Sequence, residues 1–387
     1  MLPVGRNAGG VNPRRFHRRR PAHRPATGRR LVRRSNYPPR RLRLPAGHRL
    51  AHPPRADLAA RIVFTIRNYA EDDLPALLDF VVPLHQNDGD VNPDAAVHRS
   101  VFADIMRLPG RDQRRDCLLL FQDSGDGAPT LQGFCLVFPE PSGKDSPGGR
   151  CVLNIHAAPG HVAPGEDYET GWRGLLRAGL RRTQETGSSV AHIALWPPYE
   201  RAEALAAGGF AAARVYWNMT WENQAIPDVE MPDGYRVRSF TEHDVAALTA
   251  THNSTFAGTW WFAPYTEAQT AHRARMANTS YDGIKLLFQD EQLAGYCWTL
   301  LMSDGQRQQG VIGSIGLAPE FRGGGISRLI LAAGMRHLRS AGADYIRLEV
   351  DGDNAPAIRL YQSLGFQKAG ELHWYEHRLA ANAASAV

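Results

Sequence analysis

The sequence predicts an α/β protein in which one unit of alternating strands and helices occurs twice. Two observations support this fold class. Apolar runs typical of strands alternate with amphipathic helical stretches, which is the pattern of a sheet flanked by helices. Five short landmarks also recur in the same order in the two halves of the chain. The 387 residues are enough for two such units with ordinary cores.

The recurring landmarks lie at offsets that fall steadily from 171 to 156 residues along the chain. They are 66–74 with 237–245, 119–123 with 286–290, 133–135 with 295–297, 155–159 with 315–319, and 209–210 with 365–366. Small insertions in the first copy explain a steady decrease, whereas chance matches would scatter. We therefore predict two domains, 63–222 and 234–380, joined by an exposed, proline-containing linker at 223–233.

Both copies have the same predicted order of elements, which is clearest in the second. Each begins with a strand, at 63–68 and at 235–240, and helical stretches follow. A hairpin, a central strand, a helix, a strand, a short helix and a final strand come next, at 284–301, 309–317, 326–341, 345–350, 355–364 and 372–378. The helix at 326–341 has apolar residues on one face and stops at Gly342, a typical terminator.

Residues 1–60 form a leader that differs in composition from the rest of the chain. They hold 16 arginines, nine prolines and one acidic residue, while the remainder has a net charge of −9. Because the leader has no periodic apolar face, we expect it to be disordered. It is interpreted as a basic arm that contacts nucleic acid, as a transit peptide, or as upstream sequence that is not translated. Nucleic acid is an expected partner only under the first interpretation.

The cysteines and the hydropathy pattern indicate a soluble, cytoplasmic protein. Cys117, Cys135, Cys151 and Cys297 show no spacing typical of metal ligands, so we expect buried free thiols in a reducing compartment and no metal. No segment has 18 consecutive apolar residues, and no signal-peptide core is present. We therefore expect no membrane span and no membrane partner.

A glycine-rich turn is the strongest functional signal in the sequence. A strand-like run breaks at Pro319, the residues Arg322-Gly323-Gly324-Gly325 follow, and an amphipathic helix begins at Ile326-Ser327. Backbone N–H groups at a helix N-terminus bind phosphate, and glycines leave no side chain in the way. About 30 residues later the chain reads Asn354-x-x-Ala357-x-x-Leu360-Tyr361-x-x-x-Gly365-Phe366.

These two motifs together resemble the GNAT N-acetyltransferase superfamily, whose signature R-x-x-G-x-G/A follows the fourth strand. The second copy matches over its full length, with Ser327 in place of the usual Gly or Ala. The resemblance implies two tandem GNAT-like domains, each a mixed, largely antiparallel twisted sheet flanked by helices. It implies acetyl-CoA as the acyl donor. The cofactor-binding residues that it implies are Ile315, Leu317, Arg322, Gly323, Gly324, Gly325, Ile326, Ser327 and Asn354.

Two residues near the second motif are candidates for proton transfer. In the family, the tyrosine that matches Tyr361 protonates the leaving thiolate; a packing tyrosine is the alternative. Ribosomal-protein alanine acetyltransferases carry a run similar to Leu348-Glu349-Val350, and their glutamate is the proposed base. Glu349 is therefore a candidate base, with a solvated or salt-bridged strand residue as the alternative. A base is needed because an amine with a pKa of about 10.4 arrives mostly protonated.

The first copy lacks the glycine-rich turn and the two candidate proton-transfer residues. After Pro159 it has neither an arginine nor a glycine triplet, and the offsets place Leu205 and Ala194 where Tyr361 and Glu349 stand in the second copy. We expect the first copy to be structural or to shape the acceptor site. An inert first copy before an active second copy is similar to the mycothiol synthases, a tandem branch of the superfamily.

The acceptor site is less well specified by the sequence. Two aromatic runs, Trp260-Trp261-Phe262 with Tyr265 and His373-Trp374-Tyr375, either line an acceptor pocket or pack the two copies together. We expect an acyl-CoA-dependent N-acyltransferase, with acetyl-CoA the preferred donor, that acts on a small-molecule or peptide amine by direct attack. The alternative is a non-catalytic acyl-CoA-binding or scaffold protein of the same fold, which would not need Tyr361 and Glu349.

Overall fold

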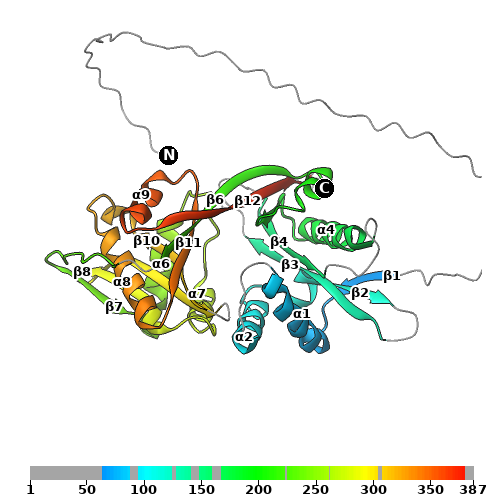
Figure 1. Cartoon of the computed structure of the whole chain (residues 1–387), viewed down its shortest axis with the longest axis horizontal. Coiled ribbons are helices and arrows are strands. Elements are labelled where there is room, and N and C mark those ends of the chain that lie inside the picture. Colours follow the sequence, from blue (N-terminus) through cyan, green and yellow to red (C-terminus); the bar gives the residue numbers. More distant parts are fainter. Residues whose placement is uncertain are drawn as a thin grey trace, which may run out of the picture. The chain divides into compact units, whose positions relative to one another are not determined.

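A single mixed sheet of 12 strands runs through the described part of the protein in the computed structural model (Figure 1). The structure describes residues 63–87, 95–123, 128–140, 148–158, 167–222, 225–260, 262–303 and 307–379. The predicted leader, 1–60, and the first part of the predicted linker, 223–224, lie outside the described residues. The predicted domain bounds therefore stay predictions.

The elements follow the same order in the two halves, as expected. The first half contains β1 (Val63–Asn68), α1 (Leu74–Asn87), α2 (Ala95–Met106), α3 (Gln113–Asp116), β2 (Cys117–Asp123), β3 (Thr130–Glu140), β4 (Arg150–Ala157), α4 (Asp167–Glu185), β5 (Val190–Leu195), α5 (Ala202–Ala207) and β6 (Ala211–Glu222). The second half contains β7 (Tyr235–Ser239), α6 (Val245–Phe256), α7 (Glu267–Ala274), β8 (Ile284–Gln289), β9 (Gln292–Ser303), β10 (Gln308–Leu317), α8 (Ser327–Ser340), β11 (Tyr345–Asp351), α9 (Ala355–Ser363) and β12 (Gln367–Arg378). The final strand begins five residues earlier than predicted.

The two halves exchange their last strands. The order across the sheet is β1-β2-β3-β4-β5-β12-β6-β11-β10-β9-β8-β7. Strand β6 of the first half pairs with β11, and β12 of the second half pairs with β5. Neighbouring strands are antiparallel except for β4 with β5 and β10 with β11, which confirms the predicted mixed, largely antiparallel sheet. The exchange merges two predicted sheets into one.

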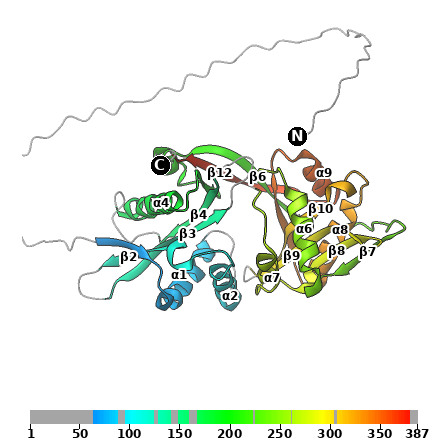
Figure 2. The same ribbon diagram turned by 180° about the vertical axis from the view of Figure 1, so that it is seen from behind.

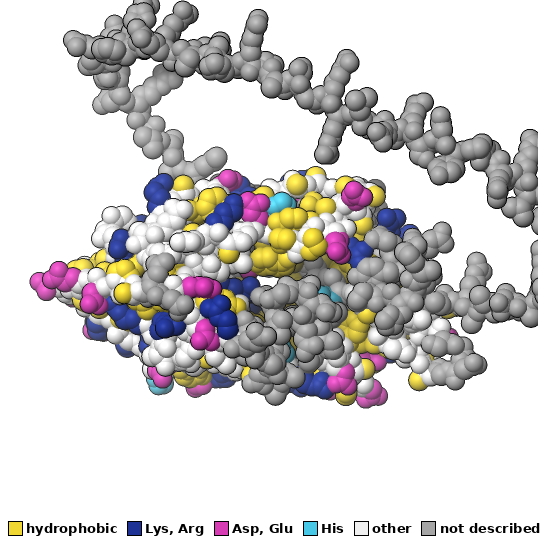
Figure 3. Space-filling model, in the orientation of Figure 1, with side chains coloured by type: hydrophobic (Ala, Val, Ile, Leu, Met, Phe, Trp, Pro, Cys, Tyr) yellow, Lys and Arg dark blue, Asp and Glu magenta, His cyan; other side chains and the backbone are white. Residues whose placement is uncertain are grey.

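Helices cover both faces of the sheet in each half (Figure 2). In the second half, α8 and α9 bury one apolar cluster against β9, β10, β11 and β6, and α6 buries another on the opposite face. In the first half, α4 and α5 cover one face while α1 and α2 cover the other. Apolar side chains stay visible over the exchanged strands (Figure 3), where Val215 of β6 is 37% exposed.

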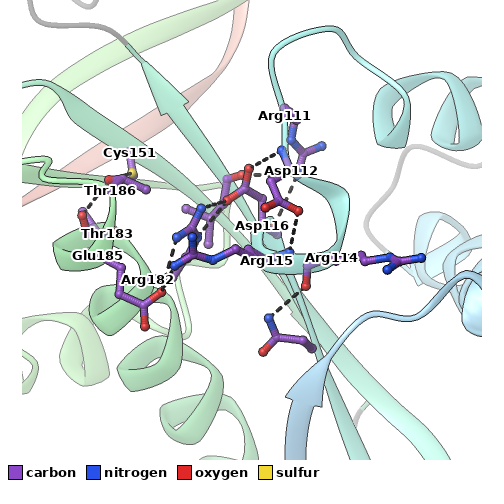
Figure 4. Close-up of polar contacts among 12 residues, drawn as sticks. Arg111, Asp112, Arg114, Arg115, Asp116, Cys151, Arg182, Thr183, Glu185 and Thr186 are labelled. Carbon is purple, nitrogen blue, oxygen red and sulfur yellow. Dashed lines mark hydrogen bonds and ion pairs between the residues drawn. The ribbon is translucent and has the colours of Figure 1, made fainter.

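A buried ion pair fixes α4 to the start of β2 (Figure 4). The guanidinium of Arg182 donates to the Asp116 carboxylate, with Nη2 and Oδ1 2.8 Å apart. The other carboxylate oxygen accepts from the backbone N–H of Asp112 at 2.9 Å. Because both partners are buried and the carboxylate has further donors, removing either one would leave an uncompensated charge in the core.

Each half opens with the same ion pair, in which an arginine of the first strand holds an aspartate at the following helical turn. Arg67 binds Asp73 through two hydrogen bonds of 2.7 and 2.6 Å, and Arg238 binds Asp244 through two of the same lengths. Asp244 also accepts from the backbone N–H of Thr241. These contacts, led by the hydrogen bond from Arg238, lower the pKa of Asp244 from 3.8 to about 2.

We expect Asp244→Asn to lower the free energy of unfolding by about 1–2 kcal/mol at pH 7. The folded-state pKa is depressed, so this stability is present above about pH 4 and is lost as the pH falls towards 2. Urea unfolding of both proteins across this range measures the effect. Asp228→Asn, which breaks an exposed pair with Arg336, is the control and should leave stability unchanged. A difference that persists undiminished at the lowest pH would contradict this assignment.

Two further expectations concern the cysteines and the membrane. All four cysteines are free thiols buried in strands, as predicted. Within the described residues, no helix is both long enough and apolar enough to cross a membrane.

Candidate functional site

Strands β10 and β11 separate partway along their length. Their parallel pairing runs from Gln309 with Tyr345 to Ile312 with Leu348 and ends there. Beyond that point β10 pairs only with β9, and β11 only with β6. The register of β10 shifts between Ile312 and Ser314, so Gly313 is the bulged residue. The residues after the bulge therefore have an unpaired side.

Ile315 and Leu317 direct their backbone groups towards this unpaired side. The N–H of Ala318 donates to the carbonyl oxygen of Ala294 at 2.9 Å, which fixes the alternation of hydrogen-bonded pairs between β10 and β9. It follows that Ser314 and Gly316 bond to β9, while Ile315 and Leu317 point away from it. An extended amide chain can add to such an edge like a strand. Both residues were predicted to play this part.

The glycine-rich turn lies between the end of β10 and the start of α8. Gly323 and Gly325 have φ angles of +92° and +75°, which favour glycine, and a Cβ added at any of Gly323, Gly324 and Gly325 would meet open space. The first helical turn has no acidic residue and no side-chain cap. Within the described part of the chain, the backbone N–H groups of residues 323–326 have no recorded acceptor. This arrangement can bind an anion.

Arg322 anchors the turn instead of extending from it. Its Nη2 donates to the carbonyl of Thr255 at 2.6 Å, and its Nε donates to the carbonyl of Leu317 at 3.3 Å. The Thr255 hydroxyl also donates to Leu317, at 3.1 Å. A Cβ on Gly316 would lie 2.1 Å from the Thr255 methyl group, so Gly316 allows α6 to pack here and is not part of the bulge. These contacts join α6, β10 and the turn.

Tyr361 lies in α9 with its side chain buried. It is 7% exposed, and its ring packs edge-on against Phe366 at 6.1 Å. Its hydroxyl makes no hydrogen bond to another described residue. Burial raises the pKa of Tyr361, so the phenol keeps its proton at neutral pH. A neutral phenol without an internal acceptor is available as a proton donor.

Glu349 and Asn354 lie on β11 and at the start of α9. Glu349 is exposed and stands opposite Asn218 of the exchanged strand β6. Asn218 is half-buried, and its Oδ1 has no partner within the described residues. Asn354 caps α9, with its Oδ1 accepting from the N–H of Ala357 at 3.2 Å. Because Oδ1 is used in the cap, only the amide NH₂ of Asn354 is left for the predicted contact with the cofactor.

A chain of hydrogen bonds reaches the bulge from α6, and the sequence analysis missed it. His252 Nδ1 and the Tyr296 hydroxyl oxygen are 2.6 Å apart, and the Tyr296 oxygen is 2.7 Å from Ser314 Oγ. Tyr265 stacks on His252 at 4.2 Å. No spacing in the sequence links these three residues.

Trp260 and Trp374, one residue from each aromatic run, pack the two halves together. Trp260 contacts His192 of β5, Tyr216 of β6 and Trp374 of β12, with ring centroids 5.2–6.1 Å apart. These contacts favour the packing interpretation for Trp260 and Trp374. Trp261 and the segment 159–166, where the first copy was predicted to lack the turn, lie outside the described residues.

The parted strands, the glycine-rich turn and the buried tyrosine point to a class of protein. Residues 229–366 match the acetyltransferase (GNAT) family. With the relatives given below, this match shows that the chain belongs to the GNAT acetyltransferases, which use acyl-CoA donors. It is an N-acetyltransferase, as the sequence predicted.

Particular relatives are mycothiol acetyltransferases. That of Thermobispora bispora is 32% identical over 244 residues, which cover 62% of this chain and 77% of the relative. That of Acidothermus cellulolyticus is 32% identical over 297 residues, covering 70% and 83%. Among solved structures, a tandem GNAT protein from the clavulanic acid biosynthesis pathway has a TM-score of 0.59 at 14% identity, covering 82% of this chain and 98% of its own. A GCN5-related N-acetyltransferase from Sphaerobacter thermophilus has a TM-score of 0.58 at 18% identity, covering 81% and 95%.

Proposed function

We propose that this protein transfers the acetyl group of acetyl-CoA to a primary amine by direct attack of the amine on the thioester. The observation that carries the proposal is the separation of β10 from β11 at Gly313, beside the glycine-rich turn. One extended ligand with a pyrophosphate at one end fits both features. The pyrophosphate would bind the N–H groups of Gly323 to Ile326. The amide-containing arm would pair with the backbone groups of Ile315 and with the N–H of Leu317, whose carbonyl already accepts from Arg322 and Thr255.

Arg322 and Ser327 belong to this site in a supporting way. Arg322 uses two of its donors on backbone carbonyls, so we assign it to holding the turn in place. Ser327 is the first residue of α8, and its small side chain leaves the helix N-terminus open. Asn354 would contact the arm through its NH₂ group.

Tyr361 and Glu349 would handle the two protons of the reaction. As the C–N bond forms and the C–S bond breaks, Tyr361 would donate its proton to the leaving sulfur. Glu349, on the exposed side of β11, would take a proton from the amine, directly or through water. Each contribution of this kind is worth about 10²–10⁴-fold in rate.

The names of the relatives suggest one acceptor to test. The relatives are named mycothiol acetyltransferases, so the amine precursor of mycothiol, des-acetylmycothiol, is a candidate acceptor for this protein as well. The broader proposal is a small-molecule or peptide primary amine, because Asn218 and Glu349 offer polar groups for such an acceptor.

The test is acetyl transfer from acetyl-CoA to a panel of amines that contains des-acetylmycothiol, amino sugars, polyamines and lysine peptides. We expect at least one amine to be acetylated, and Glu349→Gln to lower kcat/KM for it by about 10²-fold or more at pH 7. Glu222→Gln, in an exposed pair with Arg307 at the far end of β6, is the control. Binding of acetyl-CoA without transfer to any amine would favour the non-catalytic scaffold instead.

A further inference from the structure

We propose that Ser314 is a further catalytic residue whose hydroxyl oxygen accepts a hydrogen bond from the attacking amine, with Tyr296 and His252 as the positioning residues that set its orientation. This inference rests on the proposed function. It concerns the same site and names the group that holds the nitrogen of the acceptor.

Ser314 lies where β10 and β11 separate, on the side of the sheet that α6 covers. Ser314 is the first residue after the bulge, at the point where β10 loses β11 as a neighbour. Its side chain is half-buried and lies on the face covered by α6, since it bonds to Tyr296 and shares that face with Gly316. The opposite face, with Ile315 and Leu317, is covered by α8 and α9. Ser314 can therefore contact a molecule that approaches from the α6 face.

The chemistry of the chain fixes which way its protons point. A phenol is a better donor than an aliphatic hydroxyl, and a neutral imidazole nitrogen is a better acceptor than a hydroxyl oxygen. The Tyr296 hydroxyl therefore donates to His252 Nδ1, across 2.6 Å, and the Ser314 hydroxyl donates to the Tyr296 oxygen, across 2.7 Å. Ser314 Oγ is left with lone pairs only, so it accepts from an N–H group.

The surroundings keep His252 neutral, so that its Nδ1 can accept the hydrogen bond from Tyr296. Burial and then the nearby positive charge of Arg273 lower the pKa of His252 from 6.5 to about 4. The Tyr265 ring stacks on the imidazole at 4.2 Å, and Asn253 binds the backbone of Tyr265 at 2.8 and 2.9 Å. Tyr296 itself is fully buried. The chain is thus rigid and keeps one protonation state across the pH range in which amines react.

Glu349 and Ser314 would then act on different properties of the amine. Glu349 removes its proton, while Ser314 orients the lone pair of nitrogen towards the thioester carbon. An aligned nucleophile lowers the entropic part of the barrier. The distinction can be measured with hydroxylamine as the probe acceptor, because hydroxylamine is largely unprotonated at neutral pH and needs no base before it attacks.

The experiment measures hydroxamate formation from acetyl-CoA and hydroxylamine by the full chain, corrected for the rate without enzyme. We expect Ser314→Ala to lower kcat/KM for hydroxylamine by about 10-fold, with Ser314→Thr restoring most of it. Tyr296→Phe should lower it similarly, and the double variant should be no worse than Ser314→Ala because the residues act as one chain. His252→Asn keeps an acceptor at the Nδ1 position, so its kcat/KM for hydroxylamine should be higher than that of His252→Leu.

Controls separate this role from a structural one. Kd for acetyl-CoA should stay within about twofold of wild type in Ser314→Ala. Tyr235→Phe, which removes a tyrosine hydroxyl bonded to Gln289, should leave kcat/KM for hydroxylamine unchanged. An unchanged rate with hydroxylamine in Ser314→Ala, or a weakening of acetyl-CoA binding equal to the loss in rate, overturns the inference and leaves the proposed function standing. If the wild type acetylates neither hydroxylamine nor any amine of the panel, both fail.

Discussion

Tyr361→Phe is expected to lower kcat by about 10²–10⁴-fold while the Kd for acetyl-CoA stays within about twofold of wild type. The substitution removes one oxygen and keeps the ring that packs against Phe366, so the fold should be unchanged. The hydroxyl makes no hydrogen bond to another described residue, and burial raises the pKa of Tyr361, so the phenol keeps its proton at neutral pH. Steady-state kinetics together with calorimetric binding measures both quantities.

Two outcomes would contradict this role for Tyr361. A kcat near that of wild type would make Tyr361 a packing residue, the alternative that the sequence left open. A loss of acetyl-CoA binding equal to the loss in kcat would mean that the hydroxyl binds the donor rather than protonating the sulfur. Tyr235→Phe is again the matched control, because it removes a hydrogen-bonded hydroxyl far along the chain.

Gly324→Glu is expected to weaken acetyl-CoA binding by about 100-fold or more, with no change in the thermal midpoint. Gly324 has open space where a Cβ would lie and, unlike Gly323 and Gly325, no positive φ, so a side chain there does not strain the backbone. The new carboxylate would stand at the helix N-terminus, where we place the pyrophosphate, and would repel it.

Gly324→Ala is the matched control for this prediction. It adds a Cβ at the same position without the charge, and we expect its affinity for acetyl-CoA to stay close to that of wild type. If both variants bind acetyl-CoA like the wild type, the pyrophosphate does not lie at this turn. If both lose binding equally, the turn is sensitive to any side chain, and the electrostatic explanation is wrong.

The sequence predicted those features that depend on local patterns. Alternation of strand and helix signals, the repeated landmarks and the stop at Gly342 indicated the element order, because each is encoded within a few residues. The cofactor-binding roles of Ile315 and Leu317 stay predictions; strand alternation determines the direction of their backbone groups.

The features that the sequence analysis missed depend on which distant segments meet. The exchange of β6 and β12 is a choice of partner strands, and the same apolar pattern suits either partner. The bonds from Arg322 to Thr255 and from His252 to Tyr296 join residues 67 and 44 positions apart, and no motif encodes them. Arg322 was assigned to the cofactor from its place in a signature, whereas the structure shows its bonds to the backbone.

The most direct test of this account is a calorimetric titration of acetyl-CoA into the full-length wild-type protein that counts the sites. We predict one site per chain, formed by the turn at Gly323 to Gly325 and the parted strands of the second half. Absence of binding would contradict the proposed acetyltransferase site. Two sites would contradict the expectation that the first half does not bind the donor.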